Sequence, residues 1–91
     1  MLEQIQRLVG ERRYRFTLHA QDEFNALPIE LSDFEHAVRT AIVDKRTRDS
    51  SGESDYVYVL LGRTRAGHPL YCAGKLVEED DGPRFKVITV H

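Results

Sequence analysis

The sequence has few of the residues that disulfide frameworks and zinc centres require. Cys72 is the only cysteine in 91 residues, which excludes a disulfide framework and a thiolate zinc site and favours a reducing compartment. No apolar run approaches the roughly 20 residues of a membrane helix, and the N-terminus lacks the charged and apolar regions of a signal peptide. We therefore expect a single cytoplasmic domain over residues 1–91 with no membrane segment.

Metal-binding patterns are also missing. The four histidines, at positions 19, 36, 68 and 91, include no pair at the i, i+4 spacing of a helical metal site. The acidic run at residues 78–81 lacks the ligand spacing and the glycine of a calcium loop. A glycine-rich phosphate loop is absent as well. We therefore expect neither a metal nor another cofactor.

Charge is present in both signs and is unevenly distributed. The net charge of −2 argues against indiscriminate binding to phosphate backbones. Basic residues nevertheless cluster at 12–15 and 45–48, whereas acidic residues cluster at 78–81. These clusters predict a local basic face, and the alternative is ordinary solvated surface charge.

Two helices are predicted from apolar spacing and from their end signals. Residues 2–9 carry apolar side chains at helical spacing before Gly10, which is typical of a helix end. Thr17 offers a hydroxyl for an N-cap at the start of a second helix, over about residues 18–26, and Pro28 ends that helix.

A third helix follows the second after a short connection. Ser32 and Glu35 form a capping-box pattern, with the serine at the N-cap and the glutamate three residues later. The apolar periodicity extends this helix to about Val43 and places Ile42 on the core-facing side.

Beyond residue 44 the period of the sequence changes to that of strands. A brief extended segment at 13–18 precedes the second helix. The predicted strands are an edge strand at 45–49 and longer strands at 55–61, 69–77 and 84–91, separated by a loop at 50–54 and turns at 62–68 and 78–83. The chain is therefore predicted to be α+β, with two or three N-terminal helices packed on a three- to four-stranded antiparallel sheet.

Alternation along the strands predicts which side chains meet the helices. We expect Val57, Val59 and Leu61 to be buried on one strand. On the last strand we expect Ile88 and Val90 to pack on the helices. The opposite, solvent-facing side of that strand would then carry the residues at its odd positions, namely Phe85, Val87, Thr89 and His91.

An ordered series of short motifs resembles a known family. The motifs are Thr17-x-His19-Ala20, Ile29-x-x-Ser32 with Ala37, Gly62-Arg63, Gly67-x-Pro69-Leu70 and Val87-Ile88-Thr89-Val90. Together they resemble the small bacterial domains catalogued as domain of unknown function 4258, over about residues 4–91. Those domains are similar to the barnase–EndoU–colicin–RelE group, which includes metal-independent ribonucleases and the toxins of toxin–antitoxin pairs. The chain departs from the family at residues 25–28, where an arginine is common, and at the closing aromatic position, which His91 occupies.

This resemblance implies RNA as substrate and an antitoxin protein as partner. Cleaving RNA without a metal needs a base for the 2′-hydroxyl, an acid for the leaving oxygen and cations for the phosphorane. His19 is the candidate base, because a helix N-terminus disfavours its charged form. Arg63 offers a planar guanidinium for a phosphate. Thr89 and His91 complete the candidate catalytic set, and His91 can share the acid and base roles with His19.

Four further residues are candidates for RNA contact. Arg13 and Arg15 belong to the basic cluster before His19, and Tyr71 and Lys75 lie on the predicted strand at 69–77. Each candidate also has a structural alternative; His19, for example, can simply link a helix to a neighbouring strand by a hydrogen bond. The rival function is a non-catalytic binding module of the same fold that holds a protein partner on its sheet face, which the net acidity favours.

Overall fold

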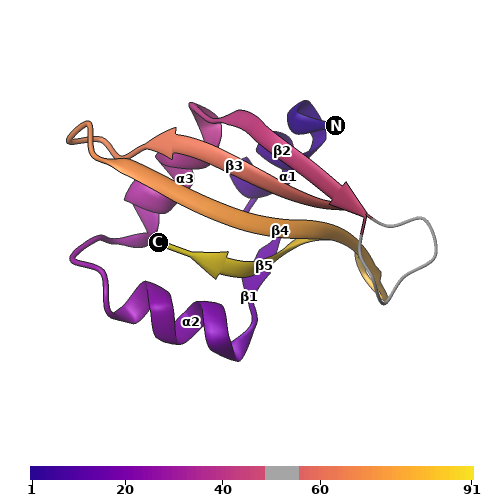
Figure 1. The fold of residues 1–91 in the computed structure, drawn as a ribbon. Coiled ribbons are helices and arrows are strands. Elements are labelled where there is room, and N and C mark those ends of the chain that lie inside the picture. The colour runs from indigo at the N-terminus through magenta and orange to yellow at the C-terminus, as the bar shows by residue number, and fades with distance from the viewer. Residues whose placement is uncertain (49–55) are drawn as a thin grey trace.

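The computed structural model describes residues 1–48 and 56–91, and within these ranges three helices pack on a five-stranded mixed sheet (Figure 1). The helices are α1 (Leu2–Gly10), α2 (Leu18–Asn25) and α3 (Leu31–Arg39). The strands are β1 (Tyr14–Phe16), β2 (Ile42–Arg48), β3 (Tyr56–Arg63), β4 (Pro69–Glu79) and β5 (Gly82–Val90). The predicted α+β class is confirmed. In the described part of the chain no helix is long and apolar enough to cross a membrane. The predicted loop at 50–54, the last residue of the predicted edge strand and Asp55 lie outside the described residues.

The sheet has the strand order β1-β5-β4-β3-β2. Strands β2 to β5 form the antiparallel meander that the sequence predicts. The brief segment at β1 adds a fifth strand, which runs parallel to β5 and places Tyr14 beside Phe85 and Phe16 beside Val87. The sheet is therefore mixed rather than purely antiparallel, since β1 pairs with the last strand of the chain.

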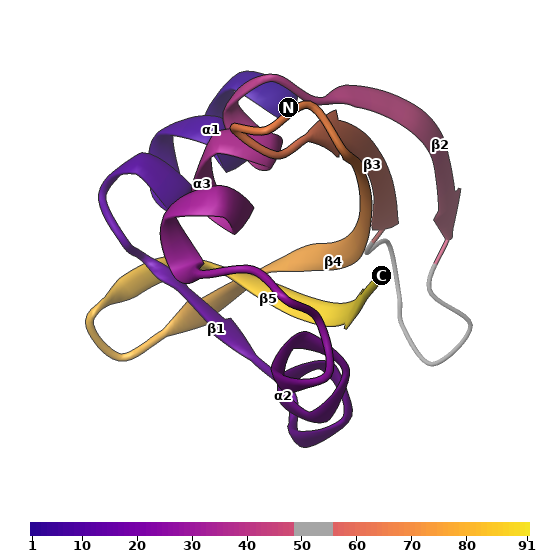
Figure 2. The same ribbon diagram turned by 90° about the vertical axis from the view of Figure 1, so that its left-hand side faces the viewer.

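The helices occupy different parts of the sheet. Helix α3 packs on β3 and β4, α1 packs against α3 and β5, and α2 packs against β5 and β1. Figure 2 shows α2 apart from the other two helices, at the side of β5. One continuous core joins all three helices to the sheet, and its largest fully buried side chains are Phe34, Phe85, Ile5 and Leu60.

The buried face of β3 is the opposite of the predicted one. Tyr58 and Leu60 are buried, whereas Val57, Val59 and Leu61 are only partly buried. Both faces of this strand are apolar, so alternation alone does not distinguish them. Gly62 decides the orientation, because a Cβ at this position would lie 1.8 Å from the carbonyl oxygen of Ala37. Helix α3 therefore packs directly on the face that carries Gly62, and β3 continues through Arg63 where a turn was predicted.

On β5 the predicted burial of Val90 is confirmed, but Phe85 and Val87 were assigned to the wrong face. Phe85 and Val87 are buried together with Val90, rather than facing solvent. The β4–β5 pairing has an irregularity, because Ala73 pairs with Thr89 whereas the next residue, Gly74, pairs with Val87. Ile88 is thus an extra residue on β5, and such a bulge shifts the alternation by one.

Helix α3 begins earlier and ends earlier than predicted. Its N-cap is Glu30, whose backbone N–H donates to Asp33 Oδ2 at 3.1 Å, in place of the predicted Ser32–Glu35 pair. The helix ends at Arg39, and the Thr40 hydroxyl donates to carbonyl oxygens of the last turn. The predicted continuation to Val43 is therefore wrong. Ile42 belongs to β2 and is 61% exposed rather than core-facing.

Candidate functional site

Helix α2 is anchored to the strand that it flanks. The Thr17 hydroxyl accepts a hydrogen bond from Ala20 N at 3.1 Å, so the predicted N-cap of α2 is confirmed. The same residue donates its backbone N–H to the carbonyl oxygen of Val87 at 3.0 Å. Helix α2 therefore starts where β1 ends, beside the last residues of β5.

Glu23 joins α2 to β5. Its Oε1 atom accepts hydrogen bonds from the Thr89 hydroxyl at 2.5 Å and from the backbone N–H of Val90 at 3.1 Å. The pairing of β1 with β5 ends at Phe16 and Val87, so no further β1 residue pairs with this part of β5. The Glu23 carboxylate thus takes the place of a neighbouring strand as acceptor for Val90.

The second oxygen of this carboxylate faces a histidine. His19 lies one helical turn before Glu23, and its Nε2 atom is 3.4 Å from Glu23 Oε2. The His19 side chain is 72% exposed, so it is not a buried link between layers. Helix α2 therefore presents an imidazole to solvent while holding it beside a carboxylate.

The pKa of Glu23 is lowered from its ordinary value. The hydrogen bond from the Thr89 hydroxyl is the largest cause and the bond from Val90 N–H is the next, while positive charge on His19 and His91 adds to the effect. Glu23 is therefore ionised at neutral pH. One carboxylate interacts electrostatically with two histidines that come from opposite ends of the sequence.

His91 extends the β4–β5 ladder by one residue. Its backbone N–H donates to the Tyr71 carbonyl at 2.9 Å, and the Tyr71 N–H donates to the His91 carbonyl at 2.7 Å. The two rings stack with their centroids 5.8 Å apart and their planes at 23°. Both side chains are solvent-exposed. These contacts define a cluster of five side chains, which we call the His19–His91 cluster: His19, Glu23, Tyr71, Thr89 and His91.

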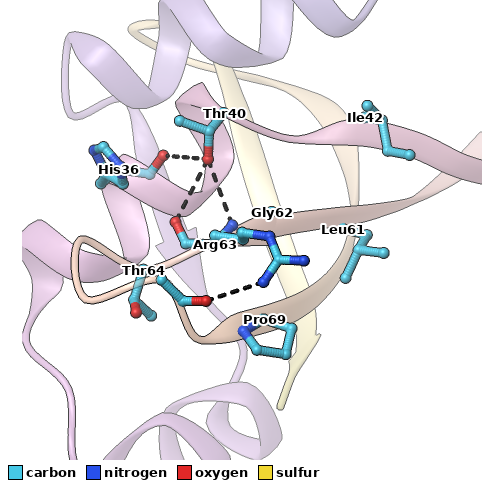
Figure 3. Close-up of a pocket in the computed structure, with 9 residues that line it drawn as sticks. His36, Thr40, Ile42, Leu61, Gly62, Arg63, Thr64 and Pro69 are labelled. Carbon is cyan, nitrogen blue, oxygen red and sulfur yellow. Dashed lines mark hydrogen bonds between the residues drawn. The ribbon is translucent and has the colours of Figure 1, made fainter.

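Arg63 belongs to a different site. It lies at the end of β3 and lines a cavity of about 500 Å³ together with His36 and Thr40 of the α3 end. Its guanidinium donates to the carbonyl oxygen of Gly67, in the turn between β3 and β4, at 3.0 Å. Figure 3 shows the Arg63 side chain pointing toward that turn. Neither His19 nor Thr89 lines this cavity. The candidate catalytic residues His19, Arg63 and Thr89 therefore separate, with His19 and Thr89 in the His19–His91 cluster and Arg63 in its own cavity.

The predicted RNA-binding residues are also spread over the molecule. Arg13 donates to the carbonyl oxygens of Pro83 at 3.0 Å and Asp81 at 2.9 Å, which ties β1 to the β4–β5 turn. Arg15 lies 2.7 Å from the carboxylate of Glu79. Both arginines thus already have acceptors within the chain.

The other two candidates lie on β4. Lys75 is half-buried and pairs with Lys86 across the β4–β5 ladder. Tyr71 contacts His91 and so belongs to the His19–His91 cluster. Of the residues in this cluster, the sequence reasoning missed Glu23. Its i, i+4 spacing from His19 on a predicted helix was the available signal.

Within the described ranges, no group of three His, Cys, Asp or Glu side chains is arranged to hold a metal ion. The chain matches no family model, and comparisons with curated proteins and with solved structures found no match either.

Proposed function

We propose that this protein is a metal-independent ribonuclease-like toxin with a RelE-like fold, acting in the cytoplasm and held in check by an antitoxin protein. The observation that carries the proposal is the Glu23 carboxylate, which has an exposed histidine on one side and interacts with a second exposed histidine. Two exposed imidazoles can supply the base and the acid that an acid–base cleavage of RNA requires.

In this mechanism His19 acts as the base. Its neutral imidazole takes the proton of the ribose 2′-hydroxyl, and the 2′-oxygen forms a bond to phosphorus. The resulting imidazolium faces Glu23 Oε2, 3.4 Å from Nε2, and this carboxylate stabilises the positive charge that develops.

His91 acts as the acid. Its imidazolium gives a proton to the 5′-oxygen as the bond between that oxygen and phosphorus breaks. The products are a 2′,3′-cyclic phosphate and a free 5′-hydroxyl. Tyr71 supports this step by keeping His91 in position. The two rings stack, and the backbones of the two residues exchange a pair of hydrogen bonds. Thr89 keeps Glu23 in place through its hydroxyl.

The test is cleavage of RNA by purified protein in the presence of EDTA. We expect cyclic-phosphate products from the wild type and a loss of about 10²- to 10⁴-fold in rate for His19→Ala and His91→Ala, the range that general acid–base groups contribute. His36→Ala, which alters a histidine of the Arg63 cavity, is the matched control and should keep the wild-type rate. Folded wild-type protein that leaves RNA intact would refute the proposal.

The proposal also predicts a cellular effect. Induced expression of the wild-type protein should slow bacterial growth, and expression of His19→Ala at the same level should not. Normal growth with abundant, folded wild-type protein would speak against a toxin.

A second candidate function is a non-catalytic module that binds a protein partner through its sheet. Every residue of the edge strand β2 is exposed, and Ile42 and Val43 are 61% and 39% exposed. An exposed edge strand is a template for the addition of a strand from a partner. For this function, Ile42→Asp should weaken capture of the partner in co-purification, and His19→Ala should leave it unchanged.

A further inference from the structure

A second cavity shares one residue, His91, with the His19–His91 cluster. It has a volume of about 420 Å³ and is formed by the connection between α2 and α3 together with the turn between β3 and β4. His91 is one of its lining residues. His91 therefore belongs both to the lining of the cavity and to the cluster. A volume of this size is typical of small-ligand sites.

The walls of this cavity are mainly apolar and include two rigid rings. Pro28 and Ile29 line it from the α2–α3 connection, and Pro69 and Leu70 line it from the start of β4. Flat apolar surfaces of this kind suit the face of a planar heterocycle, whose faces are poorly hydrated compared with its edges. A nucleobase has this shape and carries its hydrogen-bonding groups on its edges.

One carboxylate of the cavity has acceptor capacity to spare. Asp33 lines the cavity and uses Oδ2 to accept a hydrogen bond from Glu30 N at 3.1 Å. Within the described residues, its other oxygen, Oδ1, accepts no hydrogen bond. An ionised carboxylate only accepts, so a ligand in this cavity gains most when it brings an N–H donor to Asp33.

We propose that this cavity is a base-binding subsite that prefers a base with an exocyclic amino group, such as cytosine or adenine, in the nucleotide next to the cleaved bond. This inference rests on the proposed ribonuclease function, since His91 borders both the cavity and the reacting groups. The amino group of cytosine donates to Asp33, as carboxylates commonly accept from cytosine N4. Uracil has its O4 atom, an acceptor, at the same position. O4 and the Asp33 carboxylate would then face each other with no proton to share, which disfavours binding.

The test measures binding of two mononucleotides to the wild-type protein, cytidine 3′-monophosphate and uridine 3′-monophosphate, which the protein cannot cleave. Titrations followed by NMR should give a dissociation constant for the cytidine nucleotide that is about tenfold lower, the scale of one base-edge hydrogen bond. The shifted resonances should include the cavity residues Ala66 and His68.

Asp33→Asn is the decisive variant. Its amide oxygen still accepts from Glu30 N, and its amide N–H₂ group now donates, so the preference should change from the cytidine to the uridine nucleotide. Asp22→Asn removes the same charge from an exposed position on α2 and should keep the cytidine preference. Thermal unfolding of both variants shows whether the fold is intact.

The outcomes separate the two proposals. Equal affinities for the two nucleotides, an unchanged preference in a folded Asp33→Asn protein, or shifts confined to the Arg63 cavity would overturn the subsite. Selective binding that responds to Asp33→Asn in a protein that leaves RNA intact would support the subsite and refute the ribonuclease. Cleavage of RNA with no preference at either neighbouring base would support the ribonuclease and refute the subsite.

Discussion

The close approach of α3 to β3 at Gly62 makes the substitution Gly62→Ala a sharp test of the fold. The added Cβ would lie 1.8 Å from the carbonyl oxygen of Ala37 and 2.6 Å from its carbonyl carbon. Real Cβ atoms essentially never approach other atoms within 3.0 Å. The obstacle is backbone rather than a flexible side chain, so α3 as a whole has to move away from the sheet by more than about 1 Å.

The expected cost follows from two opposing effects. Overpacking of a well-packed core lowers the free energy of unfolding by about 1–3 kcal/mol. Replacing glycine by alanine raises it by about 0.4–1 kcal/mol, because alanine restricts the unfolded chain. The middle of each range gives a net destabilisation of about 1.3 kcal/mol. For a domain of this size that lowers the midpoint of thermal unfolding by about 5–10 °C.

Gly10→Ala is the matched control. Gly10 is the last residue of α1, and a Cβ there has no neighbour within 4 Å. This substitution should leave stability unchanged or raise it by up to about 1 kcal/mol. Circular dichroism of the three proteins measures both effects. A Gly62→Ala protein that unfolds within about 2 °C of the wild type, under the same conditions, would show that α3 does not pack on β3 as described.

Three further substitutions or measurements test local features of the fold. Thr17→Ala should cost about 1 kcal/mol in urea unfolding because it removes the N-cap of α2, and Thr17→Ser should keep most of it; equal losses would argue against the cap. Because the pKa of Glu23 is lowered from 4.5 in the folded protein, its contribution to stability is complete above that value and is lost as the pH falls below it; Glu23→Gln should flatten this acid dependence, and an unchanged pH profile would refute the assignment. Burial raises the pKa of Cys72 to about 12, so a thiol reagent at neutral pH should leave folded protein unmodified and label it after unfolding.

Local signals in the sequence predicted most of the secondary structure. The predicted helix at residues 2–9 corresponds to α1 at Leu2–Gly10, and the predicted strand at 69–77 corresponds to β4 at Pro69–Glu79. Apolar periodicity, an N-cap hydroxyl and a proline act within a few residues of the chain, so each can be read without the tertiary structure.

The predictions that failed depend on contacts between distant segments. The pairing of β1 with β5 joins residues about 70 positions apart, and nothing in the three residues of β1 indicates that partner. The bulge at Ile88 arises from the register between β4 and β5, and it reverses the face assignment for the residues before it. A strand such as β3, with apolar residues on both faces, is oriented only when a helix packs on one of them.

The same dependence on contacts between distant segments explains why His19 was predicted from the sequence and its partner Glu23 was not. In the sequence, Glu23 resembles any polar residue on a helix. Its role depends on the structure, in which the pairing of β1 ends at Phe16 and the N–H of Val90 donates to Glu23 instead of to a β1 residue. The short length of β1 thus creates the need for an acceptor, and α2 supplies it one turn after His19. A carboxylate that completes the sheet in this way is fixed in position by the fold itself. Its other oxygen lies 3.4 Å from His19 Nε2, so the place of this ion pair follows from the point at which β1 ends. A longer β1 that paired with Val90 would leave the Val90 N–H with no need of Glu23.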